Sequence, residues 1–214
     1  MVGLGIIIAL ALQSLVIARA HLVMSPWWIV STFAILVGII GAKGWFIVKH
    51  WRERRLEGWC IQGFIVAATL TATLLLAVLH LPVGVFFDVT APGLLLAMAV
   101  GRVGCFLAGC CGGPPTASRF GVWSSDQRVG ARRLPTQLLE SALAGIVGLL
   151  VLGAILGHGP ASGAFFALGL SAYTLGRQGI LKLRAERSMT KLGGLATSVL
   201  TAFVLIATVV LLAW

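Results

Sequence analysis

The chain has 214 residues, of which 59% are apolar and only 10% are charged, and its mean hydropathy is +1.03. A soluble domain usually carries about 25% charged residues, so a fold this apolar needs a bilayer as its solvent. The composition excludes a disordered chain, a soluble enzyme and a nucleic-acid-binding domain. The net charge of +10 therefore indicates loops at the membrane edge that meet anionic lipid headgroups.

Seven segments are apolar and long enough to be membrane helices, which need about 20 mostly apolar residues. They are residues 1–18, 27–48, 59–79, 85–108, 138–156, 161–175 and 192–214. The expected fold is an all-α polytopic membrane bundle of seven transmembrane helices, formed by residues 1–214 as a single domain. Residues 109–135 form a long polar loop, rich in Gly, Pro, Ser and Arg, and loops of this length are often functional.

Basic residues are unevenly divided between the links. The links after the second, fourth and sixth segments carry four each, and the opposite side carries Arg19 alone. The positive-inside rule places the rich side in the cytoplasm. Lys43, Arg102 and Arg177 instead lie within or at the ends of apolar segments, near the basic side. Each could snorkel to headgroups, but three cations on one side favour a polar cavity.

Three short motifs follow one another: Asp88-Val-Thr-Ala-Pro92, Gly101-Arg-Val-Gly-Cys-Phe-Leu-Ala-Gly109 and Pro135-Thr-Gln-Leu-Leu-Glu140. Gly101 and Gly104 would let a lipid or another backbone approach the helix beside Arg102. The planar guanidinium fits a phosphate through two hydrogen bonds, and phospholipid is the local source of phosphate.

The residues that follow should shape the loop and the next helix. The glycines at 109, 112 and 113 would offer backbone N–H groups to an anion. Pro135 should open the fifth helix, with Thr136 or Gln137 capping its first turn. Glu140 in that turn would be favoured by the helix dipole or would pair with Arg102.

Three of the four cysteines, Cys105, Cys110 and Cys111, cluster beside Arg102. A neighbouring cation lowers the pKa of a thiol, so one of them could be a reactive thiolate. The alternative is a role as small packing residues. With no His or Asp ligand nearby, a metal site is not expected.

The three motifs resemble the signature of the prolipoprotein diacylglyceryl transferase family, D-x-x-A-P, then G-R-[IL]-G-x-F-x-x-G, then P-[ST]-Q-L-x-E. Two further segments are similar to the family. Gly41-Ala-Lys-Gly-Trp-Phe-Ile-Val48 carries Lys43 where the family has arginine, and Tyr173-Thr-Leu-Gly-Arg177 is followed by Arg184. The family has seven membrane helices, so the resemblance covers nearly the whole chain.

The resemblance implies a transferase of the bacterial inner membrane without a cofactor. It would move a diacylglyceryl group from phosphatidylglycerol, or a related anionic phospholipid, to the lipobox cysteine of a prolipoprotein, whose signal peptide is the second partner. The resemblance implies two groups of site residues. The catalytic ones are Arg102, Arg177, Gln62 and Glu140. The substrate-binding ones are Lys43, Gly101, Gly104, Cys105, Gln137, Tyr173 and Arg184.

Some positions depart from the family. Gln62 stands where the family has a histidine that is a candidate base, and glutamine cannot accept a proton at neutral pH. Cys105 and Cys110 replace an asparagine and a glutamate, and Leu181 replaces a glutamate. His50 is the one histidine on the basic side, where an interfacial role is the simpler interpretation.

These departures leave alternatives open: a catalytically silent phospholipid-binding membrane protein, a divergent transferase with another acceptor, or a thiol-redox protein that uses Cys110 and Cys111. Orientation is also open, because the family places the basic side outside and the charge rule places it inside. Basic groups recruited to bind anionic lipid need not obey that rule, so we favour the family orientation, with the N-terminus outside.

Overall fold

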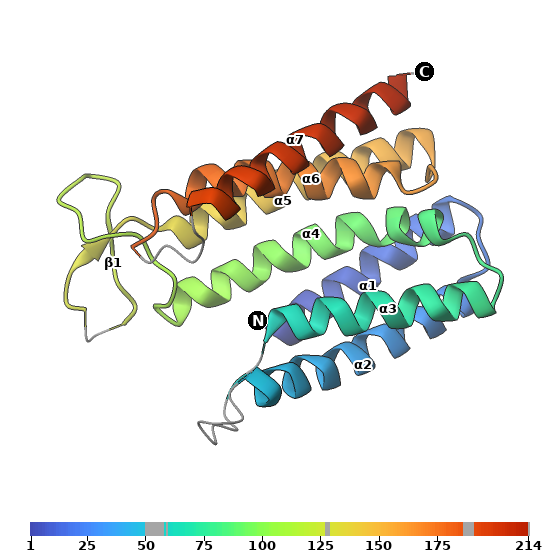
Figure 1. The fold of residues 1–214 in the computed structure, drawn as a ribbon, viewed down its shortest axis with the longest axis horizontal. Coiled ribbons are helices and arrows are strands. Elements are labelled where there is room, and N and C mark those ends of the chain that lie inside the picture. The colour runs from blue at the N-terminus through green and yellow to red at the C-terminus, as the bar shows by residue number, and fades with distance from the viewer. Residues whose placement is uncertain (50–57, 59, 127–128, 186–190, 214) are drawn as a thin grey trace. The chain divides into compact units, whose positions relative to one another are not determined.

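The computed structural model describes residues 1–49, 58, 60–126, 129–185 and 191–213. Each of the seven predicted segments forms a helix, which confirms the all-α fold class (Figure 1). The helices are α1 (Val2–Arg19), α2 (Met24–Lys49), α3 (Ile61–Val78), α4 (Val83–Leu107), α5 (Thr136–His158), α6 (Ala164–Leu181) and α7 (Lys191–Ala213). The polar loop adds two short antiparallel strands, β1 (Val122–Trp123) and β2 (Arg132–Arg133).

Six of these helices are long and apolar enough to cross a membrane. The exception within the described part of the chain is α6, which carries Arg177 and Gln178 among small residues. The sequence predicted that this helix ends at residue 175, which was wrong, because it continues to Leu181. The protein is therefore an all-α membrane protein, and the seventh crossing stays a prediction.

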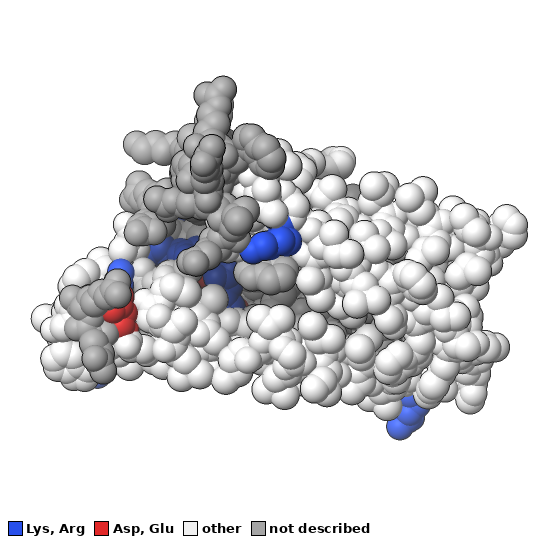
Figure 2. Space-filling view, turned by 90° about the horizontal axis from the view of Figure 1, so that it is seen from below, with Lys and Arg blue, Asp and Glu red and all other residues white. Residues whose placement is uncertain are grey.

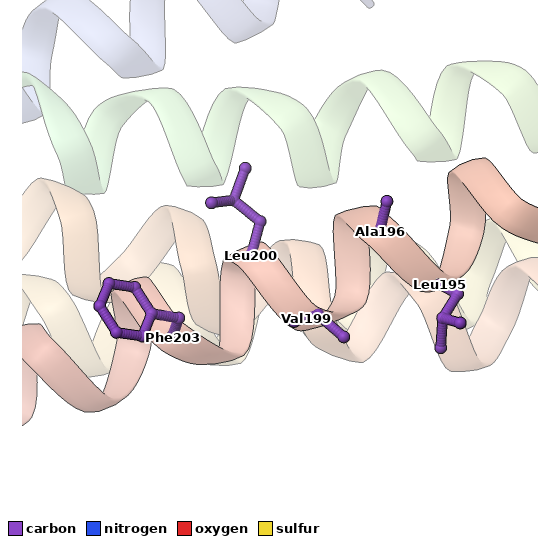
Figure 3. Close-up of a pocket in the computed structure, with 5 residues that line it drawn as sticks. All are labelled: Leu195, Ala196, Val199, Leu200 and Phe203. Atoms are coloured by element: carbon purple, nitrogen blue, oxygen red, sulfur yellow. The ribbon is translucent and has the colours of Figure 1, made fainter.

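The surface has the apolar character that a lipid environment requires. Figure 2 shows that side chains other than Lys, Arg, Asp and Glu cover most of the face it draws. On α7, Leu195, Val199, Leu200 and Phe203 are each more than 60% exposed and, with Ala196, line a shallow apolar depression (Figure 3). Large apolar patches of this kind mark membrane or protein contacts.

The described residues group into two compact units. The smaller unit, His21–Phe86, is built on the pair α2 and α3. Glycine faces glycine at this contact, because a Cβ added to Gly41 would lie 2.7 Å from the carbonyl oxygen of Gly63. Small residues at such a contact let two membrane helices pack closely. Single-domain organisation stays a prediction.

The larger unit comprises Met1–Ala20 and Phe87–Trp214. In it α6 packs against both α5 and α7. A Cβ on Gly176 would lie 2.8 Å from Cδ2 of Leu143, so α6 approaches α5 closely one residue before Arg177. Ser141 on α5 donates a hydrogen bond of 2.8 Å to the carbonyl of Ala99 on α4. These contacts bring one end of α4, α5 and α6 together.

Candidate functional site

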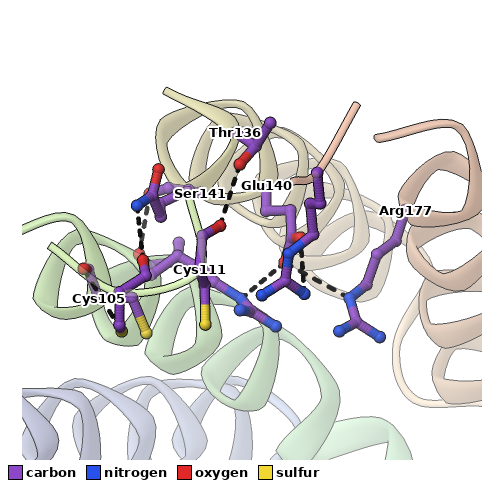
Figure 4. Close-up of polar contacts among 11 residues, drawn as sticks. Cys105, Cys111, Thr136, Glu140, Ser141 and Arg177 are labelled. Carbon is purple, nitrogen blue, oxygen red and sulfur yellow. Dashed lines mark hydrogen bonds and ion pairs between the residues drawn. The ribbon is translucent and has the colours of Figure 1, made fainter. Parts of the chain in front are cut away.

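The buried carboxylate of Glu140 is surrounded by arginines in the larger unit. The side chain of Glu140 is 1% exposed, and its Oε2 lies 2.8 Å from Nε of Arg102 and 3.4 Å from Nε of Arg177. Its Oε1 lies 3.9 Å from Nη1 of Arg184. Figure 4 shows Glu140 and Arg177 facing each other across this contact. The ion pair predicted between Glu140 and Arg102 is confirmed.

Three helices and one link supply these four side chains. Arg102 lies near the end of α4, Glu140 near the start of α5, and Arg177 near the end of α6. Arg184 follows α6, where the amide of Ala185 donates to the carbonyl of Gly112 at 3.3 Å. The links are therefore hydrogen-bonded to each other at the same place where the helix ends meet.

The charges of this cluster do not balance. Within the described part of the chain, Glu140 is the only carboxylate that Arg102, Arg177 and Arg184 contact. Among the described residues, three cations around one anion leave a net charge of +2. The side chains of Arg102 and Arg177 are 21% and 31% exposed, so the cluster is partly buried and can still be reached. Each uses Nε for Glu140, which leaves the terminal amino groups for another anion.

Two buried polar atoms beside the cluster lack a hydrogen-bond partner among the described residues: the hydroxyl of Tyr173 and Oε1 of Gln137. Tyr173 is 3% exposed, and its hydroxyl lies close enough to the Arg102 guanidinium to interact with it as an acceptor, so the partner it lacks is one for its own O–H. An unpaired buried polar group costs about 1–3 kcal/mol. Such atoms in a native site need an explanation, and a water, an ion or a bound ligand can supply the missing partner.

The residues predicted to cap α5 do something else. Gln137 donates from Nε2 to the carbonyl of Cys110 at 2.6 Å, and Thr136 donates to the carbonyl of Cys111 at 3.1 Å. Neither makes a side-chain cap on α5, and Glu140 lies beyond the first turn, so the capping and dipole predictions were wrong. Both side chains instead hold the loop after α4 against α5.

The predicted anion-binding amides are also occupied. Gly109 N–H donates to the carbonyl of Phe106 at 3.1 Å, and Gly113 N–H donates to the carbonyl of Leu134 at 2.9 Å. The prediction that these two glycines offer free donors was therefore wrong. The loop serves as a structural connection, and guanidinium groups supply the free donors of the cluster.

The predicted thiolate is not found at Cys110. Partial burial and the neighbouring thiols of Cys105 and Cys111 raise the pKa of the Cys110 thiol to about 11. At neutral pH this thiol therefore stays protonated, which contradicts the predicted lowering by Arg102. All three cysteines are free in the structure.

The glycines beside Arg102 differ from each other. Added to Gly101, a Cβ would meet nothing within 4 Å, whereas at Gly104 it would lie 2.9 Å from Cβ of Met1. Gly101 therefore borders open space, whereas Gly104 leaves room for the side chain of Met1.

Two predicted site residues belong to the smaller unit. Lys43 is half-buried on α2, and Gln62 is exposed near the start of α3, with its Oε1 3.9 Å from the Cys60 thiol. His50 lies outside the described residues. The roles predicted for Lys43 and Gln62 stay predictions.

Asp88 has a role that the sequence did not suggest. It is fully buried, and its two carboxylate oxygens accept hydrogen bonds from the amides of Gly163 at 3.1 Å and Phe166 at 2.9 Å. These amides lie at the start of α6, where a carboxylate is favoured by the helix dipole. Asp88 thus anchors the helix that carries Tyr173 and Arg177. The sequence offered one signal for this contact. Asp88 is an acidic residue within an apolar segment, and Gly163 directly precedes a later helix.

Comparison with known proteins places these features in context. A family model described as prolipoprotein diacylglyceryl transferase matches residues 1–214. The chain is similar to a phosphatidylglycerol–prolipoprotein diacylglyceryl transferase 2 of Clostridium perfringens, at 30% identity over 165 residues, which cover 71% of the chain and 64% of the relative.

Two further relatives carry the name phosphatidylglycerol–prolipoprotein diacylglyceryl transferase. The protein of Dehalococcoides mccartyi is 36% identical over 110 residues, 42% of each chain. That of Halalkalibacterium halodurans is 26% identical over an alignment of 232 positions, which covers 100% of the chain and 80% of the relative. The chain thus spans less than two thirds of the Clostridium perfringens and Dehalococcoides mccartyi relatives.

Proposed function

Because the chain belongs to the prolipoprotein diacylglyceryl transferase family, we propose that it moves the diacylglyceryl group of phosphatidylglycerol to the lipobox cysteine of a prolipoprotein in the bacterial inner membrane. The acceptor thiol gives its proton to water, and its sulfur attacks the glyceryl carbon that carries the phosphate. The carbon–oxygen bond breaks, its electron pair leaves with glycerol phosphate, and a thioether forms.

The observation that supports this proposal most strongly is the excess positive charge around Glu140. A phosphodiester carries one negative charge, whereas a departing phosphate monoester carries about 1.5 to 2 at pH 7. Two unpaired positive charges match the leaving group better than they match the intact lipid. Interactions that strengthen as charge develops are those that lower a reaction barrier.

The residues of the cluster then have distinct roles. Arg102 and Arg177 bind the phosphate oxygens through their terminal amino groups, while Glu140 orients both guanidinium groups from the Nε side. Arg184 adds charge at a longer distance. The unpaired hydroxyl of Tyr173 donates to a lipid oxygen.

Deprotonation of the acceptor is the step for which the described residues around Glu140 offer no obvious base. Gln62 cannot accept a proton. A cluster of cations lowers the pKa of an incoming thiol, because it stabilises the thiolate. We therefore assign activation of the acceptor to the same excess charge that stabilises the leaving phosphate.

Expression in a bacterium depleted of its own transferase tests the proposal. The wild-type chain should restore lipidation of a reporter prolipoprotein, seen as a mobility shift that is lost when the reporter cysteine is changed to serine. Gln62 favours a second candidate, a silent phospholipid-binding protein, and insertion without lipidation or release of glycerol phosphate would support it. Release of glycerol phosphate without reporter lipidation would indicate another acceptor.

Orientation gives an independent test. With seven crossings and the N-terminus outside, the loop that contains Ser125 faces the exterior, where an exported lipobox cysteine is presented. In a background that lacks the four native cysteines, Ser125→Cys should react with an impermeant thiol reagent in intact cells. A cysteine added at the C-terminus should not react. The reverse pattern would exclude an exported prolipoprotein as the acceptor.

A further inference from the structure

The helix that carries Arg102 ends in a specific hydrogen-bonded motif. Cys110 N–H donates to the carbonyl of Cys105 at 3.2 Å, and Gly109 N–H donates to the carbonyl of Phe106 at 3.1 Å. Gly109 has a φ of +73°, in the left-handed region. These two hydrogen bonds define a Schellman motif, a common way for an α-helix to end. Gly109 is its left-handed residue, and Cys110 follows it.

The motif brings two cysteines close to one another. In a Schellman motif the side chain that follows the left-handed residue contacts the side chain five positions earlier. Here those side chains belong to Cys110 and Cys105, and Sγ of Cys110 lies 3.6 Å from the carbonyl oxygen of Cys105. The two residues are also the two cysteines that replace other residues of the family signature.

The backbone separation is compatible with a disulfide. A disulfide needs its Cα atoms about 4.4–6.8 Å apart. An N–H to carbonyl distance of 3.2 Å between Cys110 and Cys105 keeps their Cα atoms within about 7 Å even at full extension. Cys111 is a poorer partner for Cys110, because adjacent Cα atoms across a trans peptide are fixed at about 3.8 Å.

We propose that Cys105 and Cys110 form a reversible disulfide that closes the end of α4 beside the arginine cluster. The bond forms by exchange with a disulfide-containing oxidant. One cysteine sulfur attacks the oxidant and releases its first thiol, and the second cysteine then displaces the other. Two electrons and two protons pass from the cysteines to the oxidant, which becomes two thiols.

This disulfide would connect the loop to the site. Cys105 lies one turn after Arg102, and the carbonyl of Cys110 accepts from Gln137 on α5. A covalent bond between the two cysteines would therefore join the end of α4 to a segment already held by the helix that carries Glu140. The proposal does not depend on the transferase activity, so either can fail without the other.

Counting free thiols in the full-length chain in native membranes tests the proposal. In a Cys60→Ser background, membranes are treated with oxidised glutathione at pH 8.5 and compared with membranes kept in reductant. All three remaining thiols should react with a maleimide reagent after reduction. After oxidation one should react, and the peptides containing Cys105 and Cys110 should be joined, with two hydrogens lost and no glutathione added.

Single variants identify the pair. Cys111→Ser is the matched control and should still lose two thiols on oxidation. Cys105→Ser and Cys110→Ser should each form no internal disulfide, and equal labelling of the reduced variants in the membrane shows that they fold. Persistence of all three thiols in the parent chain, or loss of the crosslink in Cys111→Ser, would overturn the proposal.

Discussion

Asp88 and Glu140 are both carboxylates that the larger unit buries almost completely, yet their surroundings differ. Asp88 is 0% exposed and accepts hydrogen bonds from two backbone amides at the start of α6. Glu140 is 1% exposed and contacts three guanidinium groups. Both act on α6, since Asp88 holds its beginning and Glu140 binds Arg177 near its end.

The difference lies in the charge that remains once each carboxylate has its hydrogen-bond donors. At Asp88 the donors are neutral amides that already belong to the fold, so the contact completes a helix end. At Glu140 three guanidinium groups share one carboxylate, so a net charge of +2 remains among the described residues, where the Tyr173 hydroxyl also lacks an acceptor. Asp88 therefore anchors the fold, whereas the excess of cations around Glu140 supports the proposed binding site.

The largest effect on activity should come from removing one of the arginines around Glu140. Arg102→Ala should lower transferase activity about 10²–10³-fold, since one donor at a developing oxyanion is worth about 2.7–4 kcal/mol. The activity is measured as lipidation of the reporter prolipoprotein in the transferase-depleted bacterium, with equal amounts of each variant inserted in the membrane. Arg102→Lys should restore activity only in part, because lysine keeps the charge and loses the fork. Wild-type activity in Arg102→Ala would remove the phosphate-site interpretation.

Removing the carboxylate of Asp88 should lower stability and leave activity unchanged. Asp88→Ala removes the acceptor for two amides, and a hydrogen bond to a charged group contributes about 1.5–3 kcal/mol. We expect a lower midpoint of thermal unfolding in detergent, with unchanged activity per folded molecule. Asp88→Asn keeps one acceptor oxygen and should lie between Ala and wild type. A loss of activity at full stability would show that Asp88 belongs to the chemistry.

Tyr173→Phe separates packing from binding by deleting only the unpaired hydroxyl. Stability should stay the same or rise, because a buried polar group without a partner is removed. Activity should fall about tenfold if the hydroxyl donates to the lipid, which corresponds to one hydrogen bond of about 1.4 kcal/mol. Thermal unfolding and reporter lipidation measured together decide between the two roles. Unchanged activity would leave Tyr173 as a packing residue.

The smallest effect is expected in the other unit. Gln62→His introduces the side chain that the family signature has at this position, and Gln62 is exposed. Activity in the reporter assay should be at least that of the wild type. A clear loss in an otherwise active chain would show that the amide of Gln62 has a role of its own.

Local patterns in the sequence predicted much of this arrangement. Apolar runs located all seven helices, because a membrane helix is defined by its own composition. The spacing of Tyr173 and Arg177 is one helical turn, which places both on one face of α6. A basic residue inside an apolar helix needs a counter-ion, so Glu140 could be proposed as the partner of Arg102.

Two of the predictions that failed, the caps proposed at Thr136 and Gln137, depended on contacts distant in sequence. Thr136 and Gln137 have the chemistry of caps, but their partners are the carbonyls of Cys111 and Cys110, more than 20 residues earlier. The pKa of Cys110 was predicted from its neighbour Arg102, whereas burial and two other thiols dominate. No local pattern reveals which donor a loop carbonyl will meet.

A reconstituted assay compares the Glu140 cluster with the Asp88 contact in the same chain. Purified chain in phosphatidylglycerol vesicles is given a peptide with a lipobox cysteine, and the glycerol phosphate released and the thioether formed are both quantified. Wild type and Asp88→Asn should form one thioether for each glycerol phosphate released, at similar rates per folded molecule, while Arg102→Ala should lose both products together. Equal rates for Arg102→Ala and Asp88→Asn would contradict the claim that excess charge around Glu140 drives the reaction.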